Sequence, residues 1–108
     1  MAQALGAWKR DQRQSCVFAE LAEADLLDIA LFIATDSPAR ALSFVAELRN
    51  HCDKITNNPK LYRLREEYGS GVRVAPRGQN PIFYCETPVG VLIERILHGA
   101  RHLDWVQV

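Results

Sequence analysis

Three side chains in the last third of the chain, Arg73, Arg95 and His98, are of types that could act together on a phosphate group. An arginine guanidinium is planar and can donate hydrogen bonds to two phosphate oxygens at once. A histidine can serve as an acid or a base, because its ordinary pKa lies near neutrality. Arg65 and Tyr84 belong to neighbouring segments and are further candidates for the same cluster. The residue types therefore admit chemistry on phosphate at this end of the chain.

The same residues also have purely structural interpretations. Arg73 and Arg95 can form ion pairs with acids such as Glu94 or Glu86. Tyr84 can be a core residue with its hydroxyl at the rim, and the histidine can simply cap the end of a strand. Such roles are common for polar residues at the edge of a core. Residue types alone leave both interpretations open.

Three short apolar segments would position these side chains. Strands are expected at Val72–Ala75, Ile82–Glu86 and Val91–Leu97, separated by segments rich in proline, glycine and asparagine. Arg73 and Arg95 would then lie on adjacent strands and could share a face. Strict alternation along the last strand places four side chains on one face: Val91, Ile93, Arg95 and Leu97.

Two helical patterns precede these strands. Apolar residues recur at spacings of three and four over residues 22–35 and again over residues 38–56. Ser37 can cap the second helix, and Pro38 fits its first position, where no N–H is needed. The linker is short, so the helices form an antiparallel hairpin, and residues 15–21 add a first strand. The predicted fold is α+β, with an N-terminal helical hairpin packed on one face of a small, mostly antiparallel sheet.

Length and charge limit the classes of function. With 108 residues, the chain can bury one modest core. Residues 1–16 are expected to form a poorly ordered extension, and residues 17–108 a single domain. The thirteen basic and thirteen acidic residues cancel, so the chain lacks the positive charge of a dedicated nucleic-acid binder. We therefore expect no direct, sequence-specific binding to nucleic acid.

Cysteine and histidine give no metal signature. The three cysteines and three histidines lack the spacing of metal ligands, so neither a metal nor another cofactor is expected. Cys52 and Cys85 are predicted to be small apolar core residues. An odd cysteine count without a disulfide pattern favours a reducing compartment. Because the N-terminal residues lack a continuous apolar stretch, we expect a cytoplasmic protein without a membrane partner.

Several short motifs occur in a characteristic order between residues 17 and 104. They are Ala24-Asp25-Leu26-x-x-Ile29, Ser37-Pro38-Ala39-x-Ala41-x-x-Phe44, Asn58-Pro59, Leu64-Arg65-Glu66, Gly71-Val72-Arg73-Val74, Ile82-Phe83-Tyr84 and Ile93-Glu94-Arg95-Ile96-Leu97-His98-Gly99-Ala100-Arg101. Their order and spacing resemble the ParE/RelE toxin superfamily, and in particular its ParE branch. The resemblance implies the toxin of a type II toxin–antitoxin module, neutralised by a small ParD-like antitoxin that wraps its surface.

The superfamily contains two activities with different chemical requirements. RelE-like toxins cleave messenger RNA on the ribosome, which needs acid–base groups and cations around the phosphate; the catalytic candidates would be Arg73, Arg95 and His98. ParE-like toxins inhibit DNA gyrase by binding and need no chemistry of their own. The RelE-like branch usually has several lysines before the sheet and a tyrosine after the last strand, whereas this chain has only Lys60 in the connection of residues 57–71 and no such tyrosine. The sequence therefore favours the gyrase inhibitor, with the ribonuclease and a non-toxic, decayed family member as alternatives.

Two surfaces are candidates for partner binding. Apolar residues widen the stripe of the first helix and are expected to contact the antitoxin in a hetero-oligomer: Leu27, Leu31 and Phe32. The antitoxin would cover a groove between the helical hairpin and the sheet. Contacts to gyrase are expected on the exposed side of the sheet and in the C-terminal segment: Arg73, Arg95, His98, Arg101 and Trp105.

Overall fold

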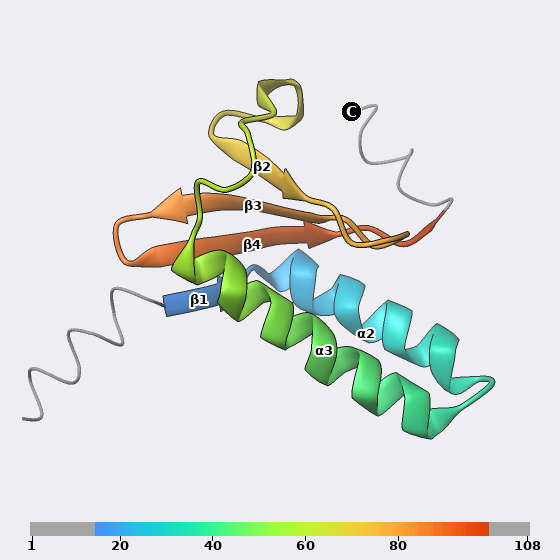
Figure 1. Cartoon of the computed structure of the whole chain (residues 1–108). Helices are drawn as coiled ribbons and strands as arrows, with labels where there is room; N and C mark the ends of the chain where they lie inside the picture. The colour runs from blue at the N-terminus through green and yellow to red at the C-terminus, as the bar shows by residue number, and fades with distance from the viewer. Residues whose placement is uncertain (1–14, 100–108) are drawn as a thin grey trace, which may run out of the picture.

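The computed structural model describes residues 15–99, which form a four-stranded sheet with two helices packed against it (Figure 1). The elements follow in the order β1 (Ser15–Phe18), α2 (Glu20–Ala34), α3 (Pro38–Asn57), the short 3-10 helix η1 (Glu66–Tyr68), β2 (Val72–Ala75), β3 (Ile82–Thr87) and β4 (Gly90–Ile96). The predicted α+β class, with a helical hairpin on a mostly antiparallel sheet, is confirmed.

The strands lie in the order β1-β4-β3-β2. β2, β3 and β4 are antiparallel neighbours, and β1 adds a parallel edge strand next to β4. β1 begins at Ser15, two residues before the start that the sequence predicted for the domain, and α2 follows it already at Glu20. Since β3 separates β2 from β4, the prediction that Arg73 and Arg95 lie on adjacent strands is wrong.

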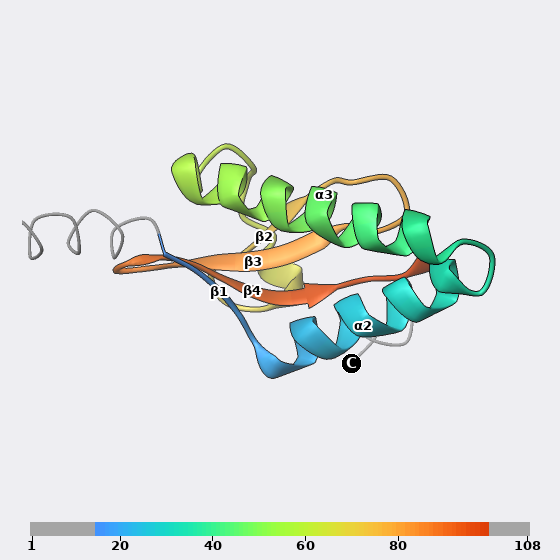
Figure 2. The ribbon, with the colours of Figure 1, turned by 90° about the horizontal axis from the view of Figure 1, so that it is seen from below.

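The second helix begins where its capping residues predict. The Ser37 hydroxyl oxygen accepts a hydrogen bond from the backbone N–H of Arg40 at 3.1 Å, and Pro38 occupies the first turn. α2 begins without a side-chain cap, but Glu20 and Glu23 in its first turn interact favourably with the helix dipole. In Figure 2 the two helices converge towards the loop that joins them, with α3 above the strands in this view and α2 below them.

The main core lies between the helices and one face of the sheet. It is built from residues of both helices and three strands: Ala22, Leu26, Ile29, Phe44, Leu48, Cys52, Ile55, Ala75, Ile82, Tyr84, Val91, Ile93 and Ile96. The Tyr84 side chain is completely buried, and its hydroxyl donates a hydrogen bond of 2.6 Å to the carbonyl of Pro59. This bond fixes the chain just after α3 to the middle of β3. Tyr84 is therefore the core residue that its structural interpretation predicted.

β4 contains a β-bulge at Glu94. Consecutive residues of β3 pair with Arg95 and Ile93, which leaves Glu94 as an extra residue in the ladder. The extra residue reverses the alternation of faces, so that Ile96 joins Ile93 against the helices while Leu97 packs on the opposite face. The common face predicted for four residues of this strand is thus wrong beyond Ile93.

Candidate functional site

The guanidinium of Arg95 is bound by Asp25, which lies 70 residues earlier in the sequence, on α2. Nε and Nη2 of Arg95 donate to the two carboxylate oxygens at 2.7 and 2.9 Å. The same carboxylate accepts the backbone N–H of Ile96 at 3.0 Å. The hydrogen bond that Asp25 accepts stabilises the charged guanidinium and raises the pKa of Arg95. The partner of Arg95 is therefore Asp25, and the prediction of Glu86 or Glu94 is corrected for this arginine.

Arg73 lies elsewhere and has other partners. Its Nη1 donates a 2.6 Å hydrogen bond to the carbonyl of Tyr62, and its Nη2 lies 3.9 Å from Glu86. Arg73 pairs in register with Tyr84, on the helix-covered face, whereas Arg95 pairs with a residue whose side chain points to the other face. The expectation that the two arginines share a face is therefore wrong.

His98 follows the end of β4 and packs against a helix. Its ring meets the ring of Phe32 edge-on, with centroids 4.9 Å apart and an angle of 63° between the planes. Its Nδ1 is buried and makes no hydrogen bond. Arg65 pairs with Glu67 at 2.8 Å and stacks over the ring of Tyr68. The candidates for phosphate chemistry are thus held by separate partners; Arg101 and Trp105 lie outside the described residues.

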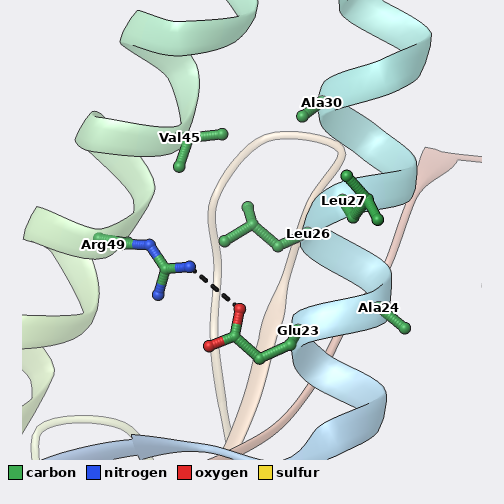
Figure 3. A pocket seen from close by; sticks show the side chains of 7 residues that line it. All are labelled: Glu23, Ala24, Leu26, Leu27, Ala30, Val45 and Arg49. Carbon is green, nitrogen blue, oxygen red and sulfur yellow. Dashed lines mark hydrogen bonds and ion pairs between the residues drawn. The ribbon is translucent and has the colours of Figure 1, made fainter.

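A groove of about 450 Å³ runs between α2 and α3 (Figure 3). Its lining is mostly apolar: Glu23, Ala24, Leu26, Leu27, Ala30, Val45 and Arg49. Figure 3 shows Leu26 extending from α2 towards α3, and the ion pair between Arg49 and Glu23, at 3.0 Å, joining the two helices beside it. Ala24 and Ala30 are small and leave room between the helices. The groove lies between the helices, and not between the hairpin and the sheet, where the sequence placed the antitoxin.

The residues predicted to bind the antitoxin are all exposed on α2. Leu27 and Leu31 are each 60% exposed and lie one turn apart on the same side of the helix. Leu27 also lines the groove, and both residues line a second, shallower hollow that includes Asp28. Phe32 is 63% exposed but leans on His98. Leu27 thus borders both the groove and the second hollow, and Leu31 continues the exposed apolar side of α2 one turn further.

Sequence reasoning missed the α3 side of this surface. Val45, a half-buried residue of α3, lines the groove together with Arg49. The signal that could have found it is the pair of small residues, Ala24 and Ala30, on the facing helix. Within residues 15–99, no three His, Cys, Asp or Glu side chains gather as a metal site would require. None of the helices described here is long and apolar enough to span a membrane.

Comparison with known proteins decides the family. Residues 16–103 match the family model described as the ParE toxin of the type II toxin–antitoxin system parDE. The chain belongs to the ParE toxin family. This confirms the resemblance seen in the sequence motifs, and the match spans every described helix and strand except the first residue of β1.

One solved structure shares the fold of this ParE-family chain. It is a chain of the chromosomal ParDE toxin–antitoxin system from P. aeruginosa, with 20% sequence identity and a TM-score of 0.66. The likeness covers 82% of this chain and 98% of that chain. No curated protein sequence matches this ParE-family chain.

Proposed function

We propose that this ParE-family chain is a toxin that inhibits DNA gyrase by binding, and that a small ParD-like antitoxin neutralises it. Family membership supports the toxin, and the similar structure comes from a system in which toxin and antitoxin occur together. Gyrase is a cytoplasmic enzyme, so the proposal places the toxin in the cytoplasm. Binding alone would cause the inhibition, with no catalytic step and no cofactor.

The Asp25–Arg95 pair is the observation that most supports a gyrase-binding inhibitor rather than a ribonuclease. Cleavage of RNA needs free cations aimed at the phosphate where negative charge develops. The Nε and Nη2 groups of Arg95 both donate to the Asp25 carboxylate, which also neutralises the charge of the guanidinium. Arg73 is turned towards the Tyr62 carbonyl on the other side of the sheet. An arrangement of this kind favours a binding protein over an RNA-cleaving site.

The antitoxin is proposed to cover Leu27, Leu31 and the groove between α2 and α3. A contiguous apolar surface on a small domain commonly marks a protein partner. A groove between helices suits an amphipathic segment that inserts apolar side chains at helical spacing. Phe32, next to His98, would extend the contact at the far end of α2. The complex of toxin and antitoxin would be a hetero-oligomer.

The surface that contacts gyrase is proposed at the end of β4. His98 lies there, and Arg101 and Trp105 follow it in the sequence. Arg73 and Arg95 have side chains only 14% and 21% exposed, so they would contribute less than the sequence suggested. The proposed gyrase surface therefore meets the proposed antitoxin surface where His98 contacts Phe32, at the end of α2.

The proposal is tested by a plasmid supercoiling assay with purified gyrase and ATP, run beside an in vitro translation reaction probed for cleaved messenger RNA. Lost supercoiling or accumulation of linear plasmid, with intact message, is the expected result. Cleaved message with normal supercoiling would instead support the RelE-like ribonuclease, and His98→Gln should then abolish cleavage. Inactivity in both assays would support a decayed member of the family or another target.

A further inference from the structure

Two cysteines from different elements meet inside the main core. Cys16 lies on β1 and pairs in register with Val91, so its side chain faces the helices. Cys52 lies on α3 and is completely buried. Cys16 packs against the buried cluster that contains Cys52, and each thiol shifts the pKa of the other. Because the cysteines are far apart in the sequence, this contact exists only through the packing of β1 against α3.

The neighbouring residues fix the same contact between strand and helix. Two residues along β1, the ring of Phe18 lies under the guanidinium of Arg49, 4.8 Å from its centroid. Arg49 precedes Cys52 by about one turn of α3. One turn later, Thr56 donates its hydroxyl hydrogen to the Cys52 carbonyl at 3.0 Å and is a further neighbour of the Cys16 thiol. Cys16 is thus held against one face of α3, between two turns of the helix.

The two thiols have opposite chemical character. The neighbouring Cys52 thiol, followed by the Thr56 side chain and the charge of Arg49, lowers the pKa of Cys16 to about 7, although burial and Asp53 oppose this. The Cys16 thiol and burial raise the pKa of Cys52. A thiolate is the nucleophile in disulfide exchange, and its reactivity depends on access. Cys16 is only partly buried, so it is the thiol that a small reagent would meet first.

The third cysteine provides an internal contrast. The Cys85 thiol donates a hydrogen bond to Oε2 of Glu94 at 3.0 Å. Burial and the neighbouring carboxylate raise the pKa of Cys85 to about 11. Both effects keep this sulfur protonated and unreactive at neutral pH. Cys85 and Cys16 are both partly exposed, so we expect a difference in their reactivity to arise from the neighbouring side chains.

We propose that Cys16 and Cys52 form a redox-modification site that a low-molecular-weight disulfide, of the glutathione disulfide class, converts into an internal disulfide. The Cys16 thiolate attacks one sulfur of the reagent, forms a mixed disulfide and releases one small thiolate. Cys52 then gives up its proton, and its sulfur displaces the second small thiolate from Cys16. Two protein thiols are oxidised to one disulfide, and one small disulfide is reduced to two small thiols. This site is independent of the proposed binding to gyrase.

The disulfide would fasten the peripheral strand of the sheet. β1 has four residues and hydrogen-bonds only to β4 within the described sheet. A bond from Cys16 to Cys52 would add a covalent link from β1 to α3 and close the chain segment that contains all of α2. Oxidation should therefore raise the midpoint of thermal unfolding, and reduction should restore the original value. In a reducing compartment such a bond would be transient and regulatory.

The test uses the full-length, reduced protein incubated with glutathione disulfide at pH 7.5, followed by alkylation and mass mapping. We expect a Cys16–Cys52 disulfide, with Cys85 still available for alkylation after unfolding. Cys52→Ala should stop at the mixed disulfide on Cys16, Cys16→Ser should leave Cys52 reduced, and Cys85→Ala should oxidise as the wild type does. The rate should fall about fivefold from pH 7 to pH 6 as the Cys16 thiolate is protonated.

Two results would overturn the proposal. One is a wild-type product that keeps glutathione on Cys16 while Cys52 stays reduced. The other is modification of Cys85 at a rate equal to that of Cys16. Both are read on the wild-type protein, so a variant that fails to fold does not obscure the answer.

Discussion

The carboxylate of Asp25 binds the guanidinium of Arg95 and the backbone N–H of Ile96 at the same time. β1 pairs with β4 only as far as Ile93, so within residues 15–99 no strand lies beside the outer edge of β4 beyond that residue. Asp25 satisfies one backbone group of this free edge and fastens α2 to it. The Asp25 side chain thus joins α2 to the sheet and also neutralises the charge of Arg95.

Replacing Asp25 with Asn should lower the free energy of unfolding by about 1–3 kcal/mol, because the half-buried guanidinium loses a charged acceptor. Urea denaturation measures the change. Asp53→Asn, at an exposed position of α3, is the matched control and should change stability by less than about 0.5 kcal/mol. Equal stability of the two variants would contradict a structural role for the Asp25–Arg95 pair.

The cap of α3 gives a second prediction. Ser37→Ala removes the oxygen that accepts the Arg40 N–H, and should cost about 1 kcal/mol of stability. Ser43→Ala changes the same residue type on the exposed surface inside α3, where alanine favours the helix, and should be neutral or stabilising. Thermal unfolding measures the stability of both variants. A similar loss of stability in both would refute the capping role of Ser37.

The fold could be predicted because its signals are local. Ser37-Pro38 sets the start of α3, and apolar periodicity sets the helices and the short strands. The bulge at Glu94 could not be predicted, because an extra residue in a ladder is defined by the partner strand. The parallel pairing of β1 with β4 is likewise a long-range contact that leaves no local pattern.

The candidate site was harder to predict than the fold. Exposure of Leu27 and Leu31 followed from counting apolar residues around one helix. The partner of Arg95 did not, because Glu94 and Glu86 are near in the strands whereas Asp25 reaches it only through packing of α2 on β4. Residue types identified the arginines as candidates, but three-dimensional packing determined which groups they bind.

Gly90 is required where β1 meets β4. Its φ is +148°, and a Cβ there would overlap the backbone carbonyl of Ser15 on the paired strand. Gly90→Ala should therefore destabilise the protein by about 3 kcal/mol or more, as severe overpacking does. Gly71→Ala is the control: its φ is +76° but a Cβ meets nothing within 4 Å, so the expected cost is about 1 kcal/mol. Chemical denaturation that ranks Gly71→Ala as the more damaging change would disprove this.

The buried hydroxyl of Tyr84 predicts a pH-dependent stability. Burial is the main cause that raises the pKa of Tyr84 to about 12, whereas the unfolded chain ionises near pH 10. The folded state therefore holds this proton more tightly, and the stabilisation is complete below pH 10 and lost as the pH rises through 12.

Tyr84→Phe removes the ionisable group together with its hydrogen bond to the Pro59 carbonyl. At pH 8 the variant should be less stable than the wild type by about 1 kcal/mol. The difference should shrink between pH 10 and pH 12, measured by urea denaturation at a series of pH values. A difference that stays constant over that range would show that Tyr84 does not titrate as proposed.

The apolar surface of α2 gives the prediction that bears most directly on function. Leu31→Asp places a charge on the proposed antitoxin surface, and it should weaken binding of the antitoxin at least tenfold, about 1.4 kcal/mol. Phe32→Asp should weaken binding less, because its ring also leans on His98. Leu61→Asp is the control: this residue is 63% exposed, close to the 60% of Leu31, but lies after α3 and outside the groove. Calorimetric titration measures the affinities, and circular dichroism checks that each variant is folded. If Leu31→Asp binds as tightly as Leu61→Asp, the antitoxin does not use this face of α2.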